Sequence, residues 1–299
     1  MFGLVGGSGR GAYRAAMRAF LMGGSGLVGR AVSRRLLTAG WDVDVVGRDA
    51  THLPADLAEG GVRFFPADRS DTAALVAAFG GGADLLVDCL CYTARHAGDL
   101  LALAGNAAST VMISSKAVYA DAAGRHANSA EPPRFDGPID ESQATVPAGE
   151  MDFNSRTGYG PNKVAAENVL LDSGLPVTVF RPSKIHGDGA LPAQTWVFVK
   201  RVLDRRPVVL LAHGGRGVDH ASAAANIAAL AEAVAARPGR RILNISDPDA
   251  PSAAEIARVV ASHLEHEWKE ILLEDDISEP LGWHPWDRKY PVVLDTGAG

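Results

Sequence analysis

The sequence has few of the features that mark secreted, membrane or metal-binding proteins. Only two of its 299 residues are cysteine, Cys89 and Cys91, which is too few for a disulfide framework or a four-cysteine metal site. No apolar run is long enough to cross a membrane, and the first residues lack the apolar stretch of a signal peptide. We therefore expect a reduced, cytoplasmic protein with no metal site and no membrane partner.

Positive charge is also scarce. The formal net charge is −6 at pH 7, and the chain has six lysines beside 23 arginines. An acidic chain of this kind lacks the basic surface that binds nucleic acid, so no nucleic-acid partner is expected. A local cluster of positive charge can still bind an anionic small molecule, and a small-molecule substrate is the expected partner.

The chain does contain a regular alternation of apolar runs and helix-spaced segments. The runs predict strands at residues 18–22, 41–47, 62–68, 83–91, 109–115 and 176–183. Helices are expected between most of them, at residues 27–40, 72–79, 96–107 and 158–174. Strands that alternate with helices form a parallel sheet covered on both faces, so we predict an α/β, Rossmann-type doubly wound fold.

The alternation loosens beyond about residue 183, and we divide the chain there. Residues 17–182 are the predicted dinucleotide-binding Rossmann domain, which includes a polar surface excursion at 121–157. Residues 183–299 are expected to form mainly a smaller C-terminal α/β lobe that binds the substrate, with helices at 194–204, 223–236 and 252–264 and a strand at 241–246. Residues 1–16 are interpreted as an N-terminal extension, with Met17 as a candidate natural start.

Two glycine-rich loops could wrap a phosphate group, at residues 3–9 and 23–29. Only the second follows a strand and precedes a helix, which is the context that a dinucleotide-binding loop requires. Its glycines fit two registers, G-x-G-x-x-G from Gly24 and G-x-x-G-x-x-G from Gly23. An ATP-type loop would need Lys and then Ser or Thr after the last glycine, and this chain has Arg and Ala there. The second loop is therefore the predicted cofactor loop.

The end of the second strand bears on which dinucleotide binds. An acidic residue there would bind the ribose 2′-hydroxyl of NAD, but this chain has Gly47 and Arg48. Arginine offers a planar, permanently charged group for a 2′-phosphate, so NADP(H) is favoured and NAD(H) stays an alternative. The alternative is that Arg48 is only a solvated charge and that Asp49 caps the next helix. Asp68, after the third strand, is placed to meet the adenine amino group or to serve as a turn residue.

Tyr159 and Lys163 stand four residues apart at the start of a strong helix, so both project from one face. A nearby ammonium favours the phenolate, and we expect it to lower the pKa of Tyr159 toward the range in which a proton donor works best. Ser115 ends the fifth strand and can hydrogen bond to a substrate oxygen, although serine is also a common turn residue.

Six segments together resemble the extended, epimerase/dehydratase-like branch of the short-chain dehydrogenase/reductase superfamily. They are GGSGLVG, FFPADRSD, DLLVDCLC, ISSKAVY, YGPNK and RPSKIHGDG, and they span about residues 17 to 190 in the expected order. Such ordered co-occurrence is more specific than any single motif. The resemblance implies that Ser115, Tyr159 and Lys163 form a catalytic set, with Tyr159 as the acid/base, Lys163 on the nicotinamide ribose and Ser115 on the substrate oxygen.

The resemblance also extends the expected binding residues. Together with those named above, the expected cofactor contacts are Gly23, Ser25, Gly26, Leu27, Val28, Arg48, Asp68, Arg69, Cys89, Leu90, Tyr159, Lys163, Pro182 and Ile185. Ser115 and, from their place in the predicted substrate lobe, Lys184 and His186 are the expected substrate contacts; the alternatives are a solvated surface charge for Lys184 and a structural histidine for His186. A homodimer is a possible assembly for a chain with this resemblance.

One departure from the branch narrows the reaction. Sugar-nucleotide dehydratases of this branch carry an acidic pair directly after the catalytic Ser or Thr, where this chain has Lys116 and Ala117. The leading interpretation is therefore a reductase or dehydrogenase that transfers hydride between NADP(H) and a carbonyl or secondary alcohol. The alternatives are an NAD-dependent sugar-nucleotide epimerase and a non-catalytic NADP-binding sensor.

Overall fold

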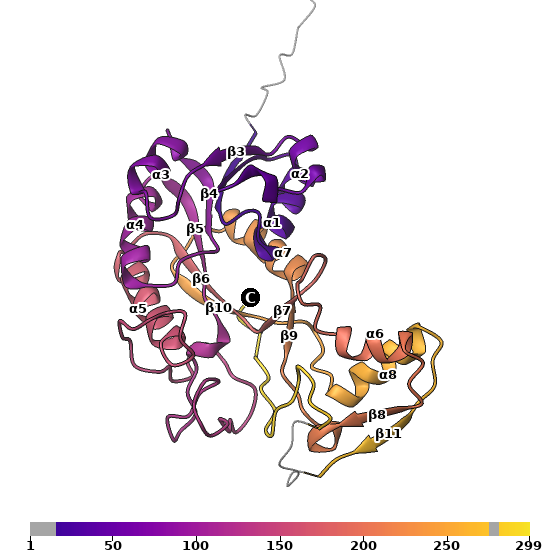
Figure 1. The fold of residues 1–299 in the computed structure, drawn as a ribbon. Helices are drawn as coiled ribbons and strands as arrows, with labels where there is room; N and C mark the ends of the chain where they lie inside the picture. Colours follow the sequence, from indigo (N-terminus) through magenta and orange to yellow (C-terminus); the bar gives the residue numbers. More distant parts are fainter. Residues whose placement is uncertain (1–15, 275–280) are drawn as a thin grey trace, which may run out of the picture.

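A computed structural model describes residues 16–274 and 281–299 of the chain. At its centre lies a sheet of seven parallel strands in the order β10-β6-β5-β4-β1-β2-β3 (Figure 1). These strands are β1 (Arg18–Met22), β2 (Asp42–Gly47), β3 (Arg63–Pro66), β4 (Ala83–Asp88), β5 (Ala107–Ile113), β6 (Val177–Pro182) and β10 (Arg241–Ile245). The doubly wound α/β fold that the sequence predicts is thereby confirmed. Of the expected N-terminal extension, residues 1–15 lie outside the described residues.

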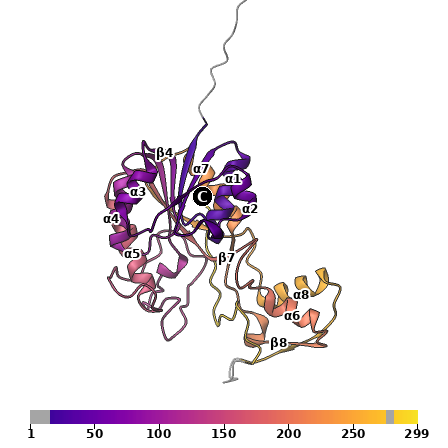
Figure 2. The same cartoon turned by 45° about the horizontal axis from the view of Figure 1, so that its top comes forward.

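Helices cover both faces of this sheet. They are α1 (Leu27–Thr38), α2 (Ala55–Glu59), α3 (Thr72–Phe79), α4 (Ala94–Ala104), α5 (Tyr159–Asp172) and α7 (Ala224–Ala235). Figure 2 shows α3, α4 and α5 on one side of the strands and α1, α2 and α7 on the other. Successive side chains of a strand point to opposite faces, so Leu21 packs into the core under α1 and α7, whereas Phe20 packs into the core under α3 and α4.

The C-terminal half contributes more to the sheet than the predicted boundary at residue 182 implies. Strand β10, expected in the smaller lobe, pairs in parallel with β6, and helix α7 packs against α1 and β5. The physical reason is the apolar character of β6, where Val179 and Phe180 are completely buried. Leu243 and Ile245 of β10 extend the core beyond it, so the strand is not left as an apolar edge.

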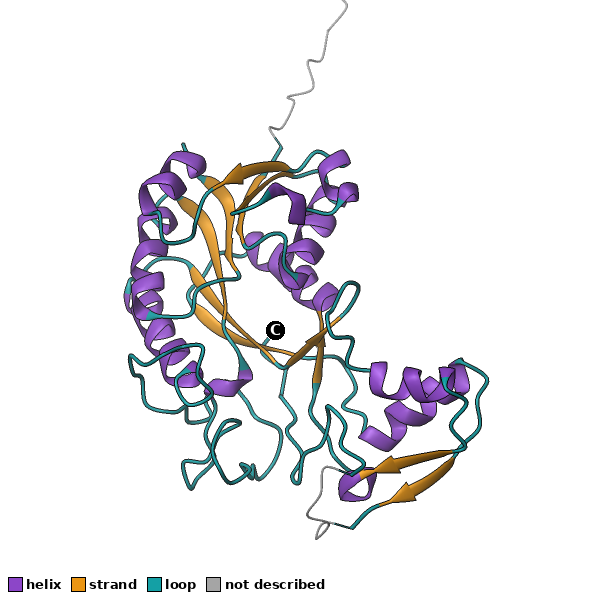
Figure 3. Cartoon of the chain, in the orientation of Figure 1, coloured by secondary structure: helices purple, strands orange, loops and turns teal. Residues whose placement is uncertain are grey.

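The remaining C-terminal elements form the smaller lobe. They are β7 (Lys184–His186), α6 (Trp196–Leu203), β8 (Val208–Leu211), β9 (Ala221–Ala223), α8 (Ala253–His263) and β11 (Lys269–Leu272). Figure 3 shows α6 and α8 lying beside the β8–β11 pair, away from the main sheet. The core of this lobe contains Phe198, whose ring stacks on Trp286 with 6.0 Å between the centroids. The sequence predicts the helices but not these short strands, which are too brief to show a period.

The excursion at residues 121–157 and the C-terminal segment pair with each other, and the C-terminal segment also pairs with the smaller lobe. Ile139 bridges to Leu294, and Val292 bridges to Asp219 in the smaller lobe. Tyr119, Ile139 and Val292 share a small apolar core. The final segment therefore ties the excursion to the smaller lobe. No helix within the described ranges is long and apolar enough to span a membrane.

Candidate active site

The loop between β1 and α1 is shaped by glycine. Gly23 has a φ of +82°, which favours glycine, and its N–H donates to the carbonyl of Val46. A Cβ at Gly29 would lie 2.4 Å from the carbonyl oxygen of Gly23, so only glycine lets the first turn of α1 approach the loop this closely. Helix α1 starts after Gly26 without a side-chain cap or an acidic residue in its first turn. Its first N–H groups are therefore available to an anion such as a diphosphate.

A groove of about 690 Å³ runs from this loop along the carboxyl ends of β1 to β4. Seven of the predicted cofactor residues line it: Gly23, Ser25, Gly26, Arg48, Asp68, Arg69 and Leu90. In doubly wound sheets, ligands bind where the strand order reverses, and here this point lies between β1 and β4. The groove is therefore placed and lined to hold a dinucleotide.

Other predicted cofactor residues lie elsewhere. Leu27 and Ile185 line a second, larger cleft. Val28 is a buried core residue, Cys89 packs against the same core, and Pro182 is buried at the end of β6. The side chains of these last three residues thus serve packing, and any contact with a bound molecule would have to come from their backbone.

The acidic residues of the groove are both engaged in local turns. The side chain of Asp49 accepts hydrogen bonds from the N–H (2.8 Å) and the hydroxyl (2.7 Å) of Thr51. That of Asp68 accepts in the same way from Ser70, at 2.9 and 2.6 Å. These hydrogen bonds lower the pKa of both carboxyls, and the bond from the side-chain hydroxyl has the larger effect. Both carboxyls are therefore anions at neutral pH. Arg48 directly precedes Asp49 in sequence and also lines the groove.

Arg69 has a buried partner that the sequence did not reveal. Its Nη2 donates to Asp88 at 2.8 Å and to the carbonyl of His96 at 2.6 Å. Asp88 is completely buried at the end of β4, and burial raises the pKa of this carboxyl, an effect that Arg69 opposes. The ion pair connects the loop after β3 to the end of β4, so Arg69 helps to fix the wall of the groove.

Three further residues of the groove were missed in the sequence. Tyr92, His96 and Phe153 line its inner end. The ring of Phe153, from the surface excursion, stacks on Tyr92 with 5.3 Å between the centroids, and His96 meets Tyr92 edge-on at 6.4 Å. The only available signal was the position of Tyr92 just after β4, at the ligand-binding edge. Because 61 residues separate Tyr92 from Phe153, no local pattern predicts their contact.

Of the predicted catalytic residues, Tyr159 and Lys163 lie beside Tyr92, which lines the groove, and Ser115 lies beside Tyr159. Tyr159 opens α5, and Ser115 precedes the 3₁₀ turn Lys116–Val118 that packs against α5. The Tyr159 hydroxyl hydrogen bonds with Ser115, whose Oγ also accepts from the N–H of Ala117 at 3.1 Å. The Tyr159 and Tyr92 rings lie 6.4 Å apart. A tyrosine hydroxyl and a serine hydroxyl are thereby presented together beside an aromatic wall.

Lys163 lies one helical turn beyond Tyr159 and is buried. Its Nζ donates to the carbonyls of Cys91 (2.7 Å) and Ile113 (2.8 Å), at the ends of β4 and β5. It lies 4.3 Å from the centroid of the Tyr92 ring and 5.9 Å from that of Tyr159. Burial lowers the pKa of Lys163 to about 8. The ammonium is thus held by two carbonyls and an aromatic face rather than by a carboxylate.

The expected lowering of the Tyr159 pKa is wrong for this structure. Burial raises the pKa of Tyr159, and the hydrogen bond with Ser115 opposes this effect only in part. The physical reason is that the Lys163 ammonium is directed at the carbonyls of Cys91 and Ile113, while the phenol ring is enclosed by protein. The phenol is therefore the stable form of Tyr159 here, as a proton donor requires.

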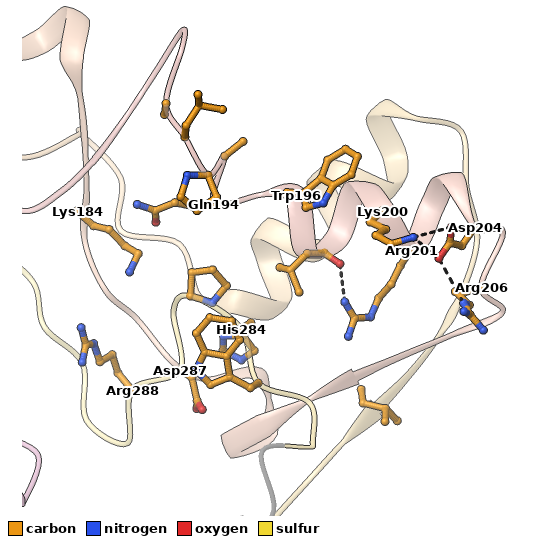
Figure 4. A pocket seen from close by; sticks show the side chains of 18 of the residues that line it. Lys184, Gln194, Trp196, Lys200, Arg201, Asp204, Arg206, His284, Asp287 and Arg288 are labelled. Atoms are coloured by element: carbon orange, nitrogen blue, oxygen red, sulfur yellow. Dashed lines mark hydrogen bonds and ion pairs between the residues drawn. The ribbon is translucent and has the colours of Figure 1, made fainter. Parts of the chain in front are cut away.

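The larger cleft lies between the sheet and the smaller lobe and has a volume of about 1240 Å³ (Figure 4). Lys184, an expected substrate contact, is one of the residues that line it. His186 does not line it, because its Nε2 lies 2.6 Å from Asp247, which also accepts from the N–H of Ala223. His186 belongs instead to a separate cavity of about 540 Å³. Within residues 16–274 and 281–299, no group of His, Cys, Asp and Glu is placed to hold a metal ion.

Comparison with known proteins links this site to a family. The model of the NAD dependent epimerase/dehydratase family matches residues 19–246, which include the glycine loop and the Ser115, Tyr159 and Lys163 set. No curated protein matches the chain by sequence.

Solved structures resemble the chain in fold. WbmG of Bordetella bronchiseptica, in complex with NAD and UDP, has a TM-score of 0.70 at 18% identity, over 95% of this chain and 86% of that chain. UDP-N-acetylglucosamine 4-epimerase from Bacillus cereus has a TM-score of 0.69 at 14% identity, over 95% and 91%. dTDP-glucose 4,6-dehydratase from Bacillus anthracis, in complex with NAD, has 0.67 at 13%, over 95% and 89%.

Proposed function

Because the chain belongs to the NAD dependent epimerase/dehydratase family, we propose that it is an NADP(H)-dependent oxidoreductase acting on a carbonyl or secondary alcohol. The observation that carries the proposal is the grouping of Ser115, Tyr159 and Lys163 beside Tyr92, a residue that lines the predicted dinucleotide groove. A purely cofactor-binding protein has no need of a paired tyrosine and serine at that position. The proposal therefore favours an enzyme over a sensor.

Each of the three residues has a distinct role in the proposed reaction. The dinucleotide, when bound, supplies or accepts the hydride at the substrate carbon. In the direction of reduction, Tyr159 donates the phenolic proton to the oxygen of the carbonyl, and Ser115 donates a hydrogen bond that orients this oxygen. Lys163 positions Tyr159, since its ammonium ties the start of α5 to the carbonyls of Cys91 and Ile113. The phenolate then recovers a proton from solvent.

The NADP preference rests on Arg48. The groove offers this guanidinium beside Gly47, which has no side chain to fill the space where a ribose 2′-phosphate would lie. Asp49 is the carboxylate closest in sequence, and its side chain is held by Thr51. It is therefore less free to bind the 2′-hydroxyl of an NAD ribose.

A sugar-nucleotide epimerase with a retained NAD is the second candidate. It is favoured by two solved structures of similar fold, one in complex with NAD and UDP and one a UDP-N-acetylglucosamine 4-epimerase. An epimerase would use Tyr159 in both proton transfers and would keep its cofactor between turnovers. The two candidates thus differ in whether the dinucleotide exchanges.

Cofactor exchange and turnover test the proposal together. The purified protein is screened with NADPH and a panel of aldehydes and ketones, with NADPH absorbance as the readout. The proposal expects turnover that Tyr159→Phe removes while NADPH still binds. Activity in Tyr159→Phe equal to that of the wild type would contradict the mechanism.

A further inference from the structure

Cations gather around one buried carboxylate next to Ser115. The carboxylate is Asp219, whose side chain is 1% exposed. Lys116, the residue after Ser115, donates from Nζ to Oδ1 of Asp219. Arg288 donates to the other oxygen, Oδ2, from Nη2 at 2.9 Å and Nε at 3.1 Å. Lys184 Nζ lies 3.5 Å from the same oxygen. We call these four residues, Lys116, Lys184, Asp219 and Arg288, the Asp219 cluster.

The Asp219 cluster has more positive than negative groups. Within residues 16–274 and 281–299, Asp219 is the single carboxylate within ion-pair distance of Lys116, Lys184 or Arg288. Burial is the main reason that the pKa of Lys116 lies well below its usual value, and the charges of Arg288 and Lys184 lower it further. Even with Lys116 neutral, Lys184 and Arg288 outnumber the carboxylate. The side chains of Lys184 and Arg288 are 21% and 35% exposed, so their charge is only partly solvated, and an incoming anion would offset the cost of this partial burial.

The cluster faces open space on two sides. Lys184 and Arg288 line the larger cleft, and Figure 4 shows their side chains extending toward the same end of it. Lys116 and Arg288 line an adjoining cavity of about 140 Å³. Two more cations, Arg156 and Lys289, line this cavity and are exposed. A bound group could therefore reach the cluster from the cleft without displacing the protein core.

The other end of the cleft is different. There Lys200 donates to both oxygens of Asp204, at 2.9 and 3.0 Å, and Arg206 lies 3.8 Å from the same carboxylate. Arg201 donates to the carbonyl of Val197 at 2.5 Å. Because the cations at that end already have partners and are close to solvent, the unbalanced charge is concentrated at the Ser115 end.

We propose that Lys116, Lys184 and Arg288 bind an anionic group of the substrate, a carboxylate or a phosphoryl group, beside the carbon that reacts. This inference rests on the oxidoreductase function proposed above. The Arg288 guanidinium can donate two parallel hydrogen bonds to a planar or tetrahedral oxyanion, and the two ammonium groups add point charges. Asp219 keeps the three side chains together when no substrate is bound. Lys116 directly follows Ser115 in the chain, so the backbone connects the proposed anion site to the residue that orients the substrate oxygen.

Anion binding can be measured without turnover. The full chain, saturated with NADP⁺ so that the glycine loop is occupied, is titrated calorimetrically with malonate and with inorganic phosphate at an ionic strength fixed with KCl. We expect at least one of the two anions to bind at one site per chain, and the tighter of them identifies the group as carboxylate or phosphoryl. Lys184→Gln and Arg288→Gln should each weaken this binding about tenfold or more.

Two further variants control for charge and for folding. Lys184→Arg keeps a cation in the cluster and should retain binding, whereas Lys200→Gln removes a cation from the same cleft and should leave binding unchanged. Absence of binding to the wild-type chain beyond the KCl background overturns the inference, as does equal weakening by Lys200→Gln and Lys184→Gln. A chain that binds NADP⁺ but neither anion contradicts this inference alone. A chain that binds an anion through Lys184 but no dinucleotide contradicts the proposed function alone.

Discussion

The Nζ of Lys163 lies 5.9 Å from the centroid of the Tyr159 ring, one helical turn away, and is tied to the carbonyls of Cys91 and Ile113. These two hydrogen bonds anchor α5 to the carboxyl ends of β4 and β5. The position of the Tyr159 hydroxyl relative to the sheet therefore depends on a buried lysine. Lys163 thus joins the fold to the proposed chemistry.

Replacing Lys163 by Met should separate these two roles. The variant removes the two hydrogen bonds of the ammonium but keeps a chain of similar length, so we expect turnover to fall about 100-fold because the Tyr159 hydroxyl is no longer held in place relative to the sheet. Steady-state reduction of a carbonyl substrate with NADPH measures the effect. Thermal unfolding of the same variant is the control, and a variant that folds with unchanged turnover would contradict the role of Lys163.

Arg48→Ala should lower the affinity for NADPH and leave the affinity for NADH nearly unchanged. A charge-assisted contact with a 2′-phosphate contributes about 1.5–3 kcal/mol, which corresponds to roughly a tenfold to hundredfold change in Kd. Fluorescence titration with both dinucleotides gives the two constants. If both affinities fall equally, Arg48 has no part in the choice between them.

Binding of malonate should weaken as the pH rises through about 8. The pKa of Lys184 is lowered to about 8, mainly by burial and to a smaller extent by the charge of Arg288. Lys184 is therefore charged below this pH and neutral above it. Lys116, whose pKa is also lowered, contributes in the same direction. Malonate is fully ionised over this range, so the change comes from the protein. Calorimetric titrations at pH 7 and pH 9 test the prediction, which a pH-independent affinity would contradict.

Glu167→Gln should destabilise the protein by about 3–5 kcal/mol, because it leaves the Arg181 guanidinium buried without a charged partner. The side chain of Glu167 is 1% exposed, and it accepts from Arg181 Nη2 at 2.5 Å and from the hydroxyl of Ser114. The matched control is Glu232→Gln, which removes a partly exposed ion pair with Arg35 and should cost less than about 1 kcal/mol. Urea unfolding measures the free energy of unfolding of both variants. Equal losses of stability would contradict the larger contribution expected of the buried pair.

Gly29→Ala and Gly98→Ala should change stability in opposite directions. A Cβ at Gly29 would lie 2.4 Å from a backbone oxygen, and we expect a loss of about 1–3 kcal/mol together with weaker dinucleotide binding. Gly98 lies inside α4, and a Cβ added there would meet no atom within 4 Å other than those of its chain neighbours and of the helix's own backbone, so alanine should add roughly 0.5–1 kcal/mol through helix propensity. Thermal unfolding measures both, and a stabilised Gly29→Ala would contradict the close approach of helix and loop.

The parts of the fold and site that sequence reasoning predicted depend on short-range patterns. The strand, glycine loop and helix around Gly23 to Gly29 are contiguous, and the spacing of Tyr159 and Lys163 places both on one helix face. The pairing of β10 with β6 joins segments about 60 residues apart, and no local period encodes it. The same holds for the Asp219 cluster, since Lys116 and Asp219 are 103 residues apart. The direction of the Tyr159 pKa also required the burial of its ring, which spacing alone does not provide.

Identification of the dinucleotide tests the account most directly. The purified protein is denatured, any released nucleotide is identified, and the emptied protein is titrated with NADPH and NADH. The account predicts an exchangeable site that binds NADPH about tenfold or more tighter than NADH. A stoichiometric, tightly held NAD would contradict it and would favour the epimerase.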